Sequence, residues 1–366
     1  MHSHDSAFCI SQLVAVCSGP RRHFVCYSCR TLAEQGASIS SLESTAPVPN
    51  ALPPIGSLAD SDVVASGALP GAGHGRRAAA VGALLRSCRP RQWVKNLLVG
   101  AAPAAAGVLF QPGVLYRVAL AFAAFCLLSS ATYLLNDVRD RGEDRLHPIK
   151  RFRPVAAGEL SPRAALRAAV VIGAAGLLLA GVVRPALGLI GVIYLLVTGC
   201  YSLWWRHVAG ADILAVASGF VLRGLAGGAA VDVPVSRWFV LVTSAGALFV
   251  VAGKRYAELR ASGSARATRE TLRRYSERQL AAALWLAALV SLAAYCMWAI
   301  RRTEHGPVPW NELTVLPFTL WLGRYAGLLR GGRGEAPEAL VLGDRVLLLL
   351  SAAWIALFAC GVYVGR

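Results

Sequence analysis

Apolar and polar segments alternate along most of this chain, with a repeat close to the length of a membrane-spanning helix. Runs of mainly apolar residues recur after residue 95, and an α-helix of about 20 such residues crosses the hydrocarbon core of a bilayer. Two of the polar linkers between the runs, 137–163 and 254–278, are long and charged. The pattern predicts an all-α, polytopic membrane protein with about nine transmembrane helices, near 95–112, 117–136, 163–183, 185–205, 211–231, 237–253, 279–300, 312–329 and 345–364.

The composition favours a membrane protein over a soluble one. Hydrophobic residues make up 56% of the chain and charged residues 16%, whereas soluble domains carry roughly 25% charged residues. The net charge of +17 could by itself indicate a nucleic-acid partner. In so apolar a chain, loops that face anionic lipids and a phosphorylated substrate explain the charge better, so no nucleic-acid partner is expected.

Lysine and arginine are divided unequally between the two sets of predicted loops. The loops 86–95, 137–163, 204–210, 254–278 and 324–345 hold 24 of these residues, and the opposite set with the C-terminus holds six. Cytoplasmic loops are enriched in Lys and Arg. The sequence therefore predicts a plasma-membrane protein with a cytoplasmic N-terminus and both charged linkers on the cytoplasmic side.

The first 75 residues differ in kind from the predicted membrane domain, 76–366. They are rich in Ser, Gly, Pro and Ala and have no sustained helical period, which predicts a disordered tail. Cys26 and Cys29, with His23 nearby, leave a zinc site open as an alternative. A translation start closer to residue 75 is a second alternative, in which case the tail is an artefact.

The segment from Asn136 to Asp144 concentrates four acidic side chains at the end of an apolar run. If the helix continues through it, Asp137, Asp140 and Asp144 lie at i, i+3 and i+7 and share one face. Crowded carboxylates repel one another, and a hard divalent cation such as Mg²⁺ removes that repulsion. The segment predicts a Mg²⁺ site, and the alternative is a solvated acidic helix end paired with arginines.

A basic turn follows the acidic segment. Lys150, Arg151 and Arg153 lie between Pro148 and Pro154, and these prolines interrupt any helix. Cations beside metal-binding carboxylates suit a metal-bound diphosphate. The alternative is that these cations only keep the loop on the cytoplasmic side of the membrane.

A second group of polar residues precedes the first predicted span. Arg91 and Lys95 supply cations, and Gln92 and Asn96 place two amides on one helical face. This group could bind a lipid-linked phosphate. The alternative is an interfacial anchor built around Trp93.

The second charged linker opens with Lys254 and Arg255, followed by Glu258. Lys254 and Glu258 are four residues apart, as are Tyr256 and Arg260, so the segment could be a helix stabilised by pairs on its surface. The functional interpretation is a second wall that faces the acidic segment, with Lys254 and Arg255 on a phosphate.

Arg223 lies well inside the predicted span 211–231. An arginine within a membrane is costly and indicates a function or a buried partner. Asp212, about three turns away on the same predicted helix, is not an obvious partner. We expect Arg223 to line a polar cavity and contact substrate.

These residues resemble the UbiA superfamily of intramembrane prenyltransferases. The superfamily has about nine helices and an Asn-Asp-x-x-Asp-x-x-x-Asp motif after the second one. Asn136, Asp137, Asp140 and Asp144 match every position of that motif. The resemblance covers roughly residues 86–366.

The second acidic motif of the superfamily, Asp-x-x-x-Asp, is altered in this chain. Lys254-Arg255-Tyr256-Ala257-Glu258 stands in its place, with one carboxylate and two added cations. The strings 89–96 and 251–258 are similar to the branch that transfers a phosphoribosyl group to decaprenyl phosphate, for cell-wall arabinan.

That resemblance implies phosphoribosyl pyrophosphate as donor, a polyprenyl phosphate as acceptor and Mg²⁺ as cofactor. The residues it implies as catalytic are Asp137, Asp140 and Asp144, which are the metal ligands, and Lys254. Those implied in substrate binding are Arg91, Gln92, Lys95, Asn96, Asn136, Lys150, Arg151, Arg153, Arg223, Arg255, Tyr256 and Glu258. A prenyltransferase with a prenyl diphosphate donor and an aromatic acceptor stays open, as does a transporter or lipid-binding protein. A homo-oligomer is compatible with the sequence.

Overall fold

The computed structural model describes residues 72–262, 270–301, 308–331 and 336–364. The expected tail and its cysteine pair therefore lie outside the described residues, except that the first described helix, α1 (Ala72–Ser87), begins within the last four residues assigned to the tail. Every regular element in these ranges is helical. The all-α prediction is thereby confirmed.

The first half of the helical bundle is built from α3 (Val114–Arg139), α6 (Pro162–Val183), α7 (Pro185–Leu203) and α8 (Ala211–Val231). Small residues let α3 and α6 approach closely, as is usual between membrane helices. A Cβ atom on Gly176 would lie 3.1 Å from Leu128. Phe125, Leu128 and Tyr194 fill the core between these helices.

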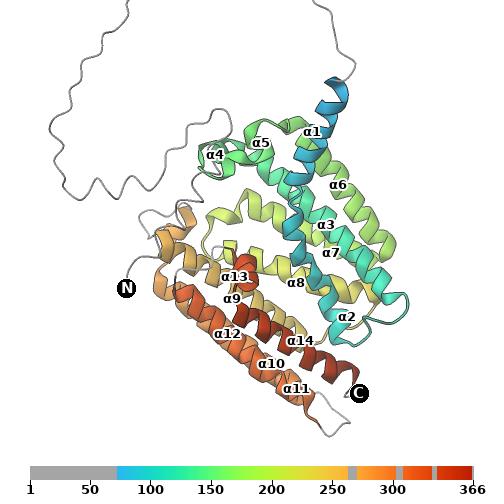
Figure 1. The fold of residues 1–366 in the computed structure, drawn as a ribbon, viewed down its shortest axis with the longest axis vertical. Coiled ribbons are helices and arrows are strands. Elements are labelled where there is room, and N and C mark those ends of the chain that lie inside the picture. Colours follow the sequence, from blue (N-terminus) through green and yellow to red (C-terminus); the bar gives the residue numbers. More distant parts are fainter. Residues whose placement is uncertain (1–71, 263–269, 302–307, 332–335, 365–366) are drawn as a thin grey trace, which may run out of the picture. The chain divides into compact units, whose positions relative to one another are not determined.

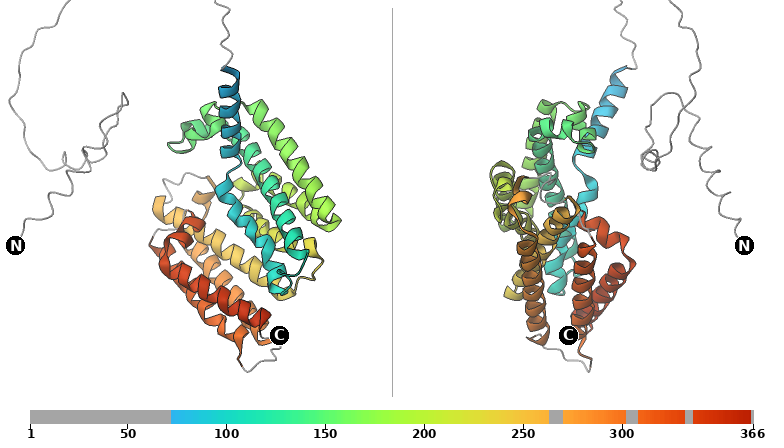
Figure 2. Two further views of the ribbon diagram at one scale, coloured as in Figure 1. Left: turned by 45° about the vertical axis from the view of Figure 1, so that its right-hand side comes forward. Right: turned by 90° about the vertical axis from the view of Figure 1, so that its left-hand side faces the viewer.

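The second half consists of α9 (Arg237–Ser262), α10 (Glu277–Arg301), α12 (Val315–Arg330) and α14 (Arg345–Tyr363). Phe249, Leu284, Tyr325 and Leu329 form its core. Figure 1 shows this half, in tan to red, beside the first half, in cyan to yellow, and the rotated views in Figure 2 agree. Helix α8 joins the halves because it packs against both α7 and α9.

Seven of the described helices are long and apolar enough to cross a membrane. They are α3, α6, α7, α8, α9, α10 and α14. Two of them, α3 and α8, are the most enclosed by the rest of the protein. These central helices carry Asp137, Asp212 and Arg223, three of the buried polar residues of the site, whereas few residues of α6, α7 and α14 are buried.

The other two predicted spans are shorter and interrupted. In place of a helix over 95–112, the 3₁₀-helix η2 (Pro90–Gly100) leads into α2 (Ala101–Ala105). The backbone of η2 lies directly on α8, since a Cβ atom on Gly227 would come 1.8 Å from the carbonyl oxygen of Val99. In place of a helix over 312–329, the chain forms α11 (Trp310–Leu313) and then the 16-residue α12.

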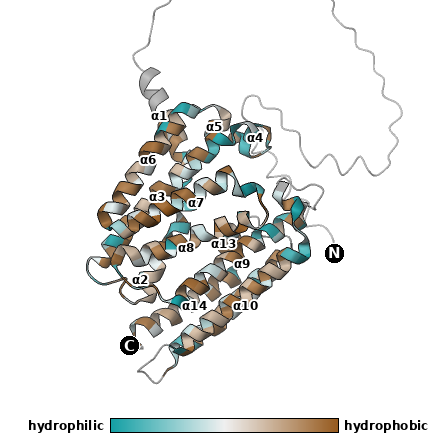
Figure 3. Ribbon diagram, turned by 180° about the vertical axis from the view of Figure 1, so that it is seen from behind, coloured by the Kyte–Doolittle hydropathy of each residue, from teal (hydrophilic) through white to brown (hydrophobic). Residues whose placement is uncertain are grey.

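Several short helices connect the long ones on the side of the bundle that holds Asn136–Asp144, which we call the motif end, and Figure 1 shows α4 and α5 together there. These are α4 (Arg141–Leu146), η3 (Lys150–Phe152), α5 (Pro154–Ala157), η4 (Trp205–His207), η6 (Glu270–Arg274) and α13 (Pro337–Gly343). Figure 3 shows hydrophilic residues at α4, while the long helices are mainly hydrophobic. The bundle thus places its polar chemistry at the motif end.

Candidate active site

Two aspartates of the acidic segment meet at a single arginine. Asp137 in α3 and Asp144 in α4 are both buried. Nη1 of Arg153 lies 2.7 Å from Oδ2 of Asp144 and 3.4 Å from Oδ1 of Asp137, and Arg89 also pairs with Asp137. We call these four residues the first carboxylate cluster.

The local backbone explains how the cluster forms. Helix α3 ends at Arg139, but the amide of Asp144 still donates to the carbonyl of Asp140, so the chain stays close to helical and keeps Asp137 and Asp144 on one face. Arg153 is extended, as expected for a residue before proline. Its side chain reaches back to both carboxylates.

Asp140 and Asn136 face a different neighbour. Nη1 of Arg206, in η4, lies 2.6 Å from Oδ1 of Asp140. The hydroxyl of Ser202, in α7, donates to Oδ1 of Asn136 at 2.6 Å. The expected triad is therefore divided, with Asp137 and Asp144 on Arg153 and Asp140 on Arg206, and within the described ranges no three acidic, histidine or cysteine side chains converge on one point.

Arginine pairing, the alternative reading of the acidic segment, describes the structure as it stands. The donor set still fits Mg²⁺, because this ion is usually held by one or two carboxylates together with phosphate oxygens of a substrate. Asp137 and Asp144 are such a pair, and one cationic nitrogen already lies between them. Asp140 would join them only after leaving Arg206.

The other basic residues of the first linker lie apart from the carboxylates. Arg151 is exposed, with its guanidinium 4.9 Å from the ring centre of Phe152. Nδ1 of His147 accepts from the amides of Ile149 and Lys150, so it shapes the turn. Of the three cations in this turn, the structure brings Arg153 into contact with the carboxylates.

A second carboxylate cluster lies between α8 and α9. Nε of Arg255 lies 3.0 Å from Asp212, and its Nη1 lies 3.0 Å from Glu258. The hydroxyl of Tyr275 donates to Asp212. Burial and that hydrogen bond raise the pKa of Tyr275 to about 12. We call Asp212, Arg255, Glu258 and Tyr275 the second carboxylate cluster.

This cluster shows how two residues noted in the sequence are placed. Asp212 pairs with Arg255 on the next helix and not with Arg223, as expected, and Arg255 is enclosed between carboxylates rather than open to a phosphate. Lys254 is more exposed and lies 3.9 Å from Glu258. Tyr256 is buried and contacts Glu277 and Arg260, which places it in the packing of α9 against α10.

Gln92 and Lys95, expected at a lipid phosphate, are brought together with a glutamate that sequence reasoning missed. Nε2 of Gln92 donates to Oε1 of Glu338 at 3.0 Å, and Nζ of Lys95 lies 3.6 Å from the same oxygen. Arg91, by contrast, is exposed. Burial would raise the pKa of Glu338, but hydrogen bonds from its own backbone and from Gln92, with the charges of Lys95 and Lys254, lower it overall.

Asn96 and Arg223 form a buried network instead of lining a polar cavity. Nε of Arg223 donates to Oδ1 of Asn96 at 2.7 Å, and its Nη2 donates to the hydroxyl of Tyr194 at 2.9 Å. Its Nη1 donates to the carbonyl of Gly219. These bonds tie η2, α7 and α8 together, and the partners explain how an arginine is accommodated in the membrane domain.

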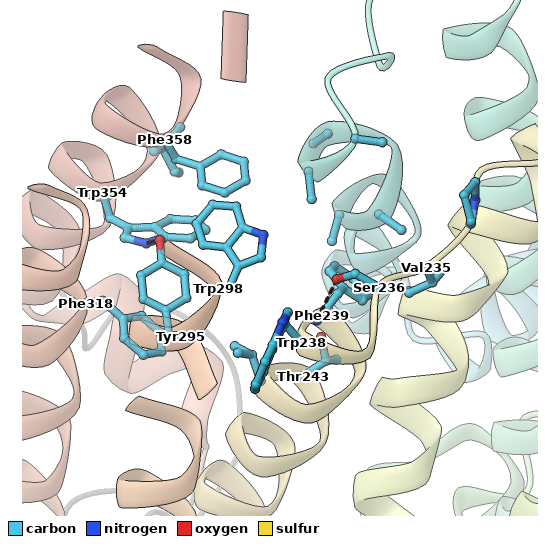
Figure 4. Close-up of a pocket in the computed structure, with 18 residues that line it drawn as sticks. Val235, Ser236, Trp238, Phe239, Thr243, Tyr295, Trp298, Phe318, Trp354 and Phe358 are labelled. Atoms are coloured by element: carbon cyan, nitrogen blue, oxygen red, sulfur yellow. Dashed lines mark hydrogen bonds between the residues drawn. The ribbon is translucent and has the colours of Figure 1, made fainter. Parts of the chain in front are cut away.

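An aromatic cavity of about 480 Å³ lies towards the other end of the bundle (Figure 4). Trp238 and Phe239 line one wall, and Tyr295, Trp298 and Trp354 line the facing wall. Trp238 precedes Lys254 by 16 residues of α9, which is roughly 24 Å of helix. The cavity suits a long apolar ligand whose polar end lies at the motif end.

Known proteins resemble this chain in both sequence and fold. The model of the UbiA prenyltransferase family matches residues 97–352. A decaprenyl-phosphate phosphoribosyltransferase of Mycobacterium tuberculosis is 42% identical over 78% of this chain and 96% of its own length. A protein of the same name from Corynebacterium glutamicum is 39% identical over 77% of this chain and 87% of its own length.

Among solved structures, a UbiA homologue from Archaeoglobus fulgidus bound to GPP and Mg²⁺ matches with a TM-score of 0.62. It is 18% identical, and the match covers 77% of this chain and 99% of that protein. At 18% identity this match supports only the fold, whereas the family model and the relatives match this chain in sequence. The chain therefore belongs to the UbiA prenyltransferase family.

Proposed function

We propose that this protein transfers a phosphoribosyl group from phosphoribosyl pyrophosphate to decaprenyl phosphate, or a similar polyprenyl phosphate, and releases diphosphate. The observation that carries the proposal is the similarity to relatives named decaprenyl-phosphate phosphoribosyltransferase, which extends over almost their whole length. Cations and carboxylates at the motif end support it. We further propose a role in making cell-wall arabinan precursors, at the cytoplasmic face of the plasma membrane.

The first carboxylate cluster would receive the diphosphate of the donor. Asp137 and Asp144 would hold Mg²⁺, with Asp140 turning from Arg206 to complete the set. The ion would neutralise charge on the leaving diphosphate. Arg153, displaced from between the carboxylates, would donate to phosphate oxygens, because a guanidinium binds phosphate with two parallel hydrogen bonds.

Lys150, Arg151 and Lys254 lie at the same end and would add charge for the 5-phosphate and the diphosphate. In the transfer, a phosphate oxygen of the acceptor forms a bond to C1 of the ribose, and the bond from C1 to the diphosphate oxygen breaks. The attacking oxygen is already anionic, so the step requires no general base. This agrees with His147 serving the turn.

The acceptor would lie across the membrane domain. Gln92 and Lys95 would bind its phosphate at the motif end. The aromatic cavity would take part of its isoprenoid chain. Arg223, Asn96 and Arg255 would hold the framework of the site without touching substrate, since all three are buried among protein partners.

A transfer assay with purified protein tests the proposal. Radiolabelled phosphoribosyl pyrophosphate and decaprenyl phosphate are supplied with and without Mg²⁺, and label in the organic phase is counted. We expect label to enter the lipid only with Mg²⁺. Transfer from labelled geranyl diphosphate to an aromatic acceptor, with no phosphoribosyl transfer, would contradict the proposal and favour an ordinary prenyltransferase.

A further inference from the structure

The 3₁₀-helix η2 brings two polar side chains, three residues apart in sequence, to the same carboxylate. Side chains at i and i+3 are in line on a 3₁₀-helix. Gln92 and Lys95 have this spacing within η2, and Arg89 is the residue that precedes the helix, in a left-handed conformation. Arg89 belongs to the first carboxylate cluster, where it pairs with Asp137, and Gln92 and Lys95 contact Glu338. The start of η2 therefore lies beside the first carboxylate cluster, and the helix itself presents Gln92 and Lys95 as a second group that can bind an anion.

The carboxylate of Glu338 already binds to the side chains of Gln92 and Lys95. One oxygen of Glu338 lies 3.0 Å from Gln92 and 3.6 Å from Lys95, and the charge of Lys254 acts on the same carboxylate. A phosphate monoester presents anionic oxygens to donors in the same way. Two anions cannot share the site without strong repulsion, so a phosphate and Glu338 would exclude each other.

Glu338 belongs to an element that is lightly held. All seven residues of α13 are at least partly exposed. The side chain of Glu338 is 26% exposed and that of Lys95 is 29% exposed. Leu340 and Val341 pack against the core, but no residue of α13 is fully buried, so a shift of this helix costs less than a shift of a buried element.

We propose that Glu338 is an internal competitor that occupies the acceptor-phosphate subsite until a lipid phosphate displaces it. This inference rests on the proposed function for the identity of the acceptor. Glu338 thereby contributes to specificity, because an uncharged polyprenol has no anionic group that could replace the Glu338 carboxylate at Gln92 and Lys95. The bound carboxylate reduces the fraction of protein that is competent to bind, and this raises the apparent Kd in proportion.

Binding of the acceptor alone tests the inference, because without donor there is no turnover. Tryptophan fluorescence of the full-length protein in detergent is titrated with decaprenyl phosphate or with decaprenol, since three tryptophans line the aromatic cavity. We expect Glu338→Gln to tighten decaprenyl phosphate binding roughly three- to tenfold, with decaprenol unchanged. Glu338→Asp, which keeps the charge, and Glu312→Gln, at an exposed site on α11, should resemble the wild type.

Equal or weaker binding of decaprenyl phosphate by Glu338→Gln, including no binding at all, would overturn the inference, as would equal tightening for both lipids. The transfer assay separates this result from the proposed function. The wild-type protein could transfer the phosphoribosyl group while Glu338→Gln binds decaprenyl phosphate no better than the wild type. That result would support the proposed function and contradict the competitor role of Glu338.

Discussion

The two carboxylate clusters use the same chemistry in different surroundings. In each, two acidic side chains share one guanidinium: Asp137 and Asp144 share Arg153, and Asp212 and Glu258 share Arg255. The arginine side chain of the first cluster is 28% exposed, and that of the second is 4% exposed. The first cation comes from a turn, and the second from the interior of a long helix.

This difference in exposure indicates that the first cluster can bind ligands and that the second cluster stabilises the fold. A partly exposed cation on a turn can leave when a metal ion and a diphosphate arrive, because water and phosphate oxygens can solvate it. A buried cation cannot leave, since removing one partner of a buried pair strands the other charge in a medium of low polarity. We therefore expect substitutions in the first cluster to reduce activity and those in the second to reduce stability.

The largest expected effect is on turnover. Asp137→Asn or Asp144→Asn removes a charge needed to hold Mg²⁺, which supplies several kcal/mol of stabilisation in such sites. We expect phosphoribosyl transfer to fall at least about 100-fold, with an unchanged yield of folded protein by gel filtration. Glu143→Gln, an exposed acid of the same segment, is the control and should retain activity within about twofold. Full activity in Asp144→Asn would contradict the assignment.

The next effect is on stability. Arg255→Leu leaves Asp212 buried without its cation, and breaking a buried ion pair costs about 3–5 kcal/mol. We expect a clear loss of thermal stability in detergent. The matched control is Arg184→Ala, which breaks a more exposed pair with Asp232 and should cost about 1 kcal/mol or less. Equal melting temperatures for the two variants would contradict the expectation that the buried ion pair of Arg255 contributes more stability than the exposed pair of Arg184.

A smaller effect concerns the shape of the exchangeable cation. Arg153→Lys keeps the positive charge but loses the planar fork that binds carboxylate and phosphate oxygens in parallel. We expect about a tenfold lower kcat/KM for the donor, equivalent to about 1.4 kcal/mol, with stability little changed. A variant as active as the wild type would show that charge alone suffices at this position.

The smallest effect is a dependence of stability on pH. The pKa of Tyr275 is raised to about 12 in the folded protein, so the unfolded chain loses this proton first as the pH rises. The resulting stabilisation is present below pH 10 and is lost as the pH rises through 12. Because the side chain is only half-buried, solvent screening limits the effect to about 1 kcal/mol. Tyr275→Phe should flatten the stability curve between these pH values, and an unchanged curve would contradict the role of the hydrogen bond to Asp212.

The sequence was sufficient to predict the helical class, the family and the acidic motif, because hydrophobic periodicity and motif spacing are local properties. It also identified Arg153, which lies nine residues from Asp144. It did not predict that Asp212 pairs with Arg255, or that Gln92 binds Glu338, since these partners lie 43 and 246 residues apart. Such contacts depend on how each helix is rotated about its axis in the bundle.

The 3₁₀ conformation of η2 was also missed. Its segment has the composition of an ordinary helix start, with a proline in the first turn. The close approach of Val99 to Gly227 involves a helix more than 100 residues away in sequence. Tertiary packing therefore decides the local geometry here, and with it the alignment of Gln92 and Lys95.

The central claim is that the first carboxylate cluster, and not the second, exchanges the arginine between its carboxylates, Arg153, for a metal ion. Electron paramagnetic resonance of Mn²⁺, which prefers the same oxygen ligands as Mg²⁺, measures this directly in the presence of phosphoribosyl pyrophosphate. We predict that the wild type and Glu258→Gln bind Mn²⁺ equally and that Asp137→Asn and Asp144→Asn do not. Bound Mn²⁺ that persists in Asp144→Asn but disappears in a folded Glu258→Gln variant would contradict the account.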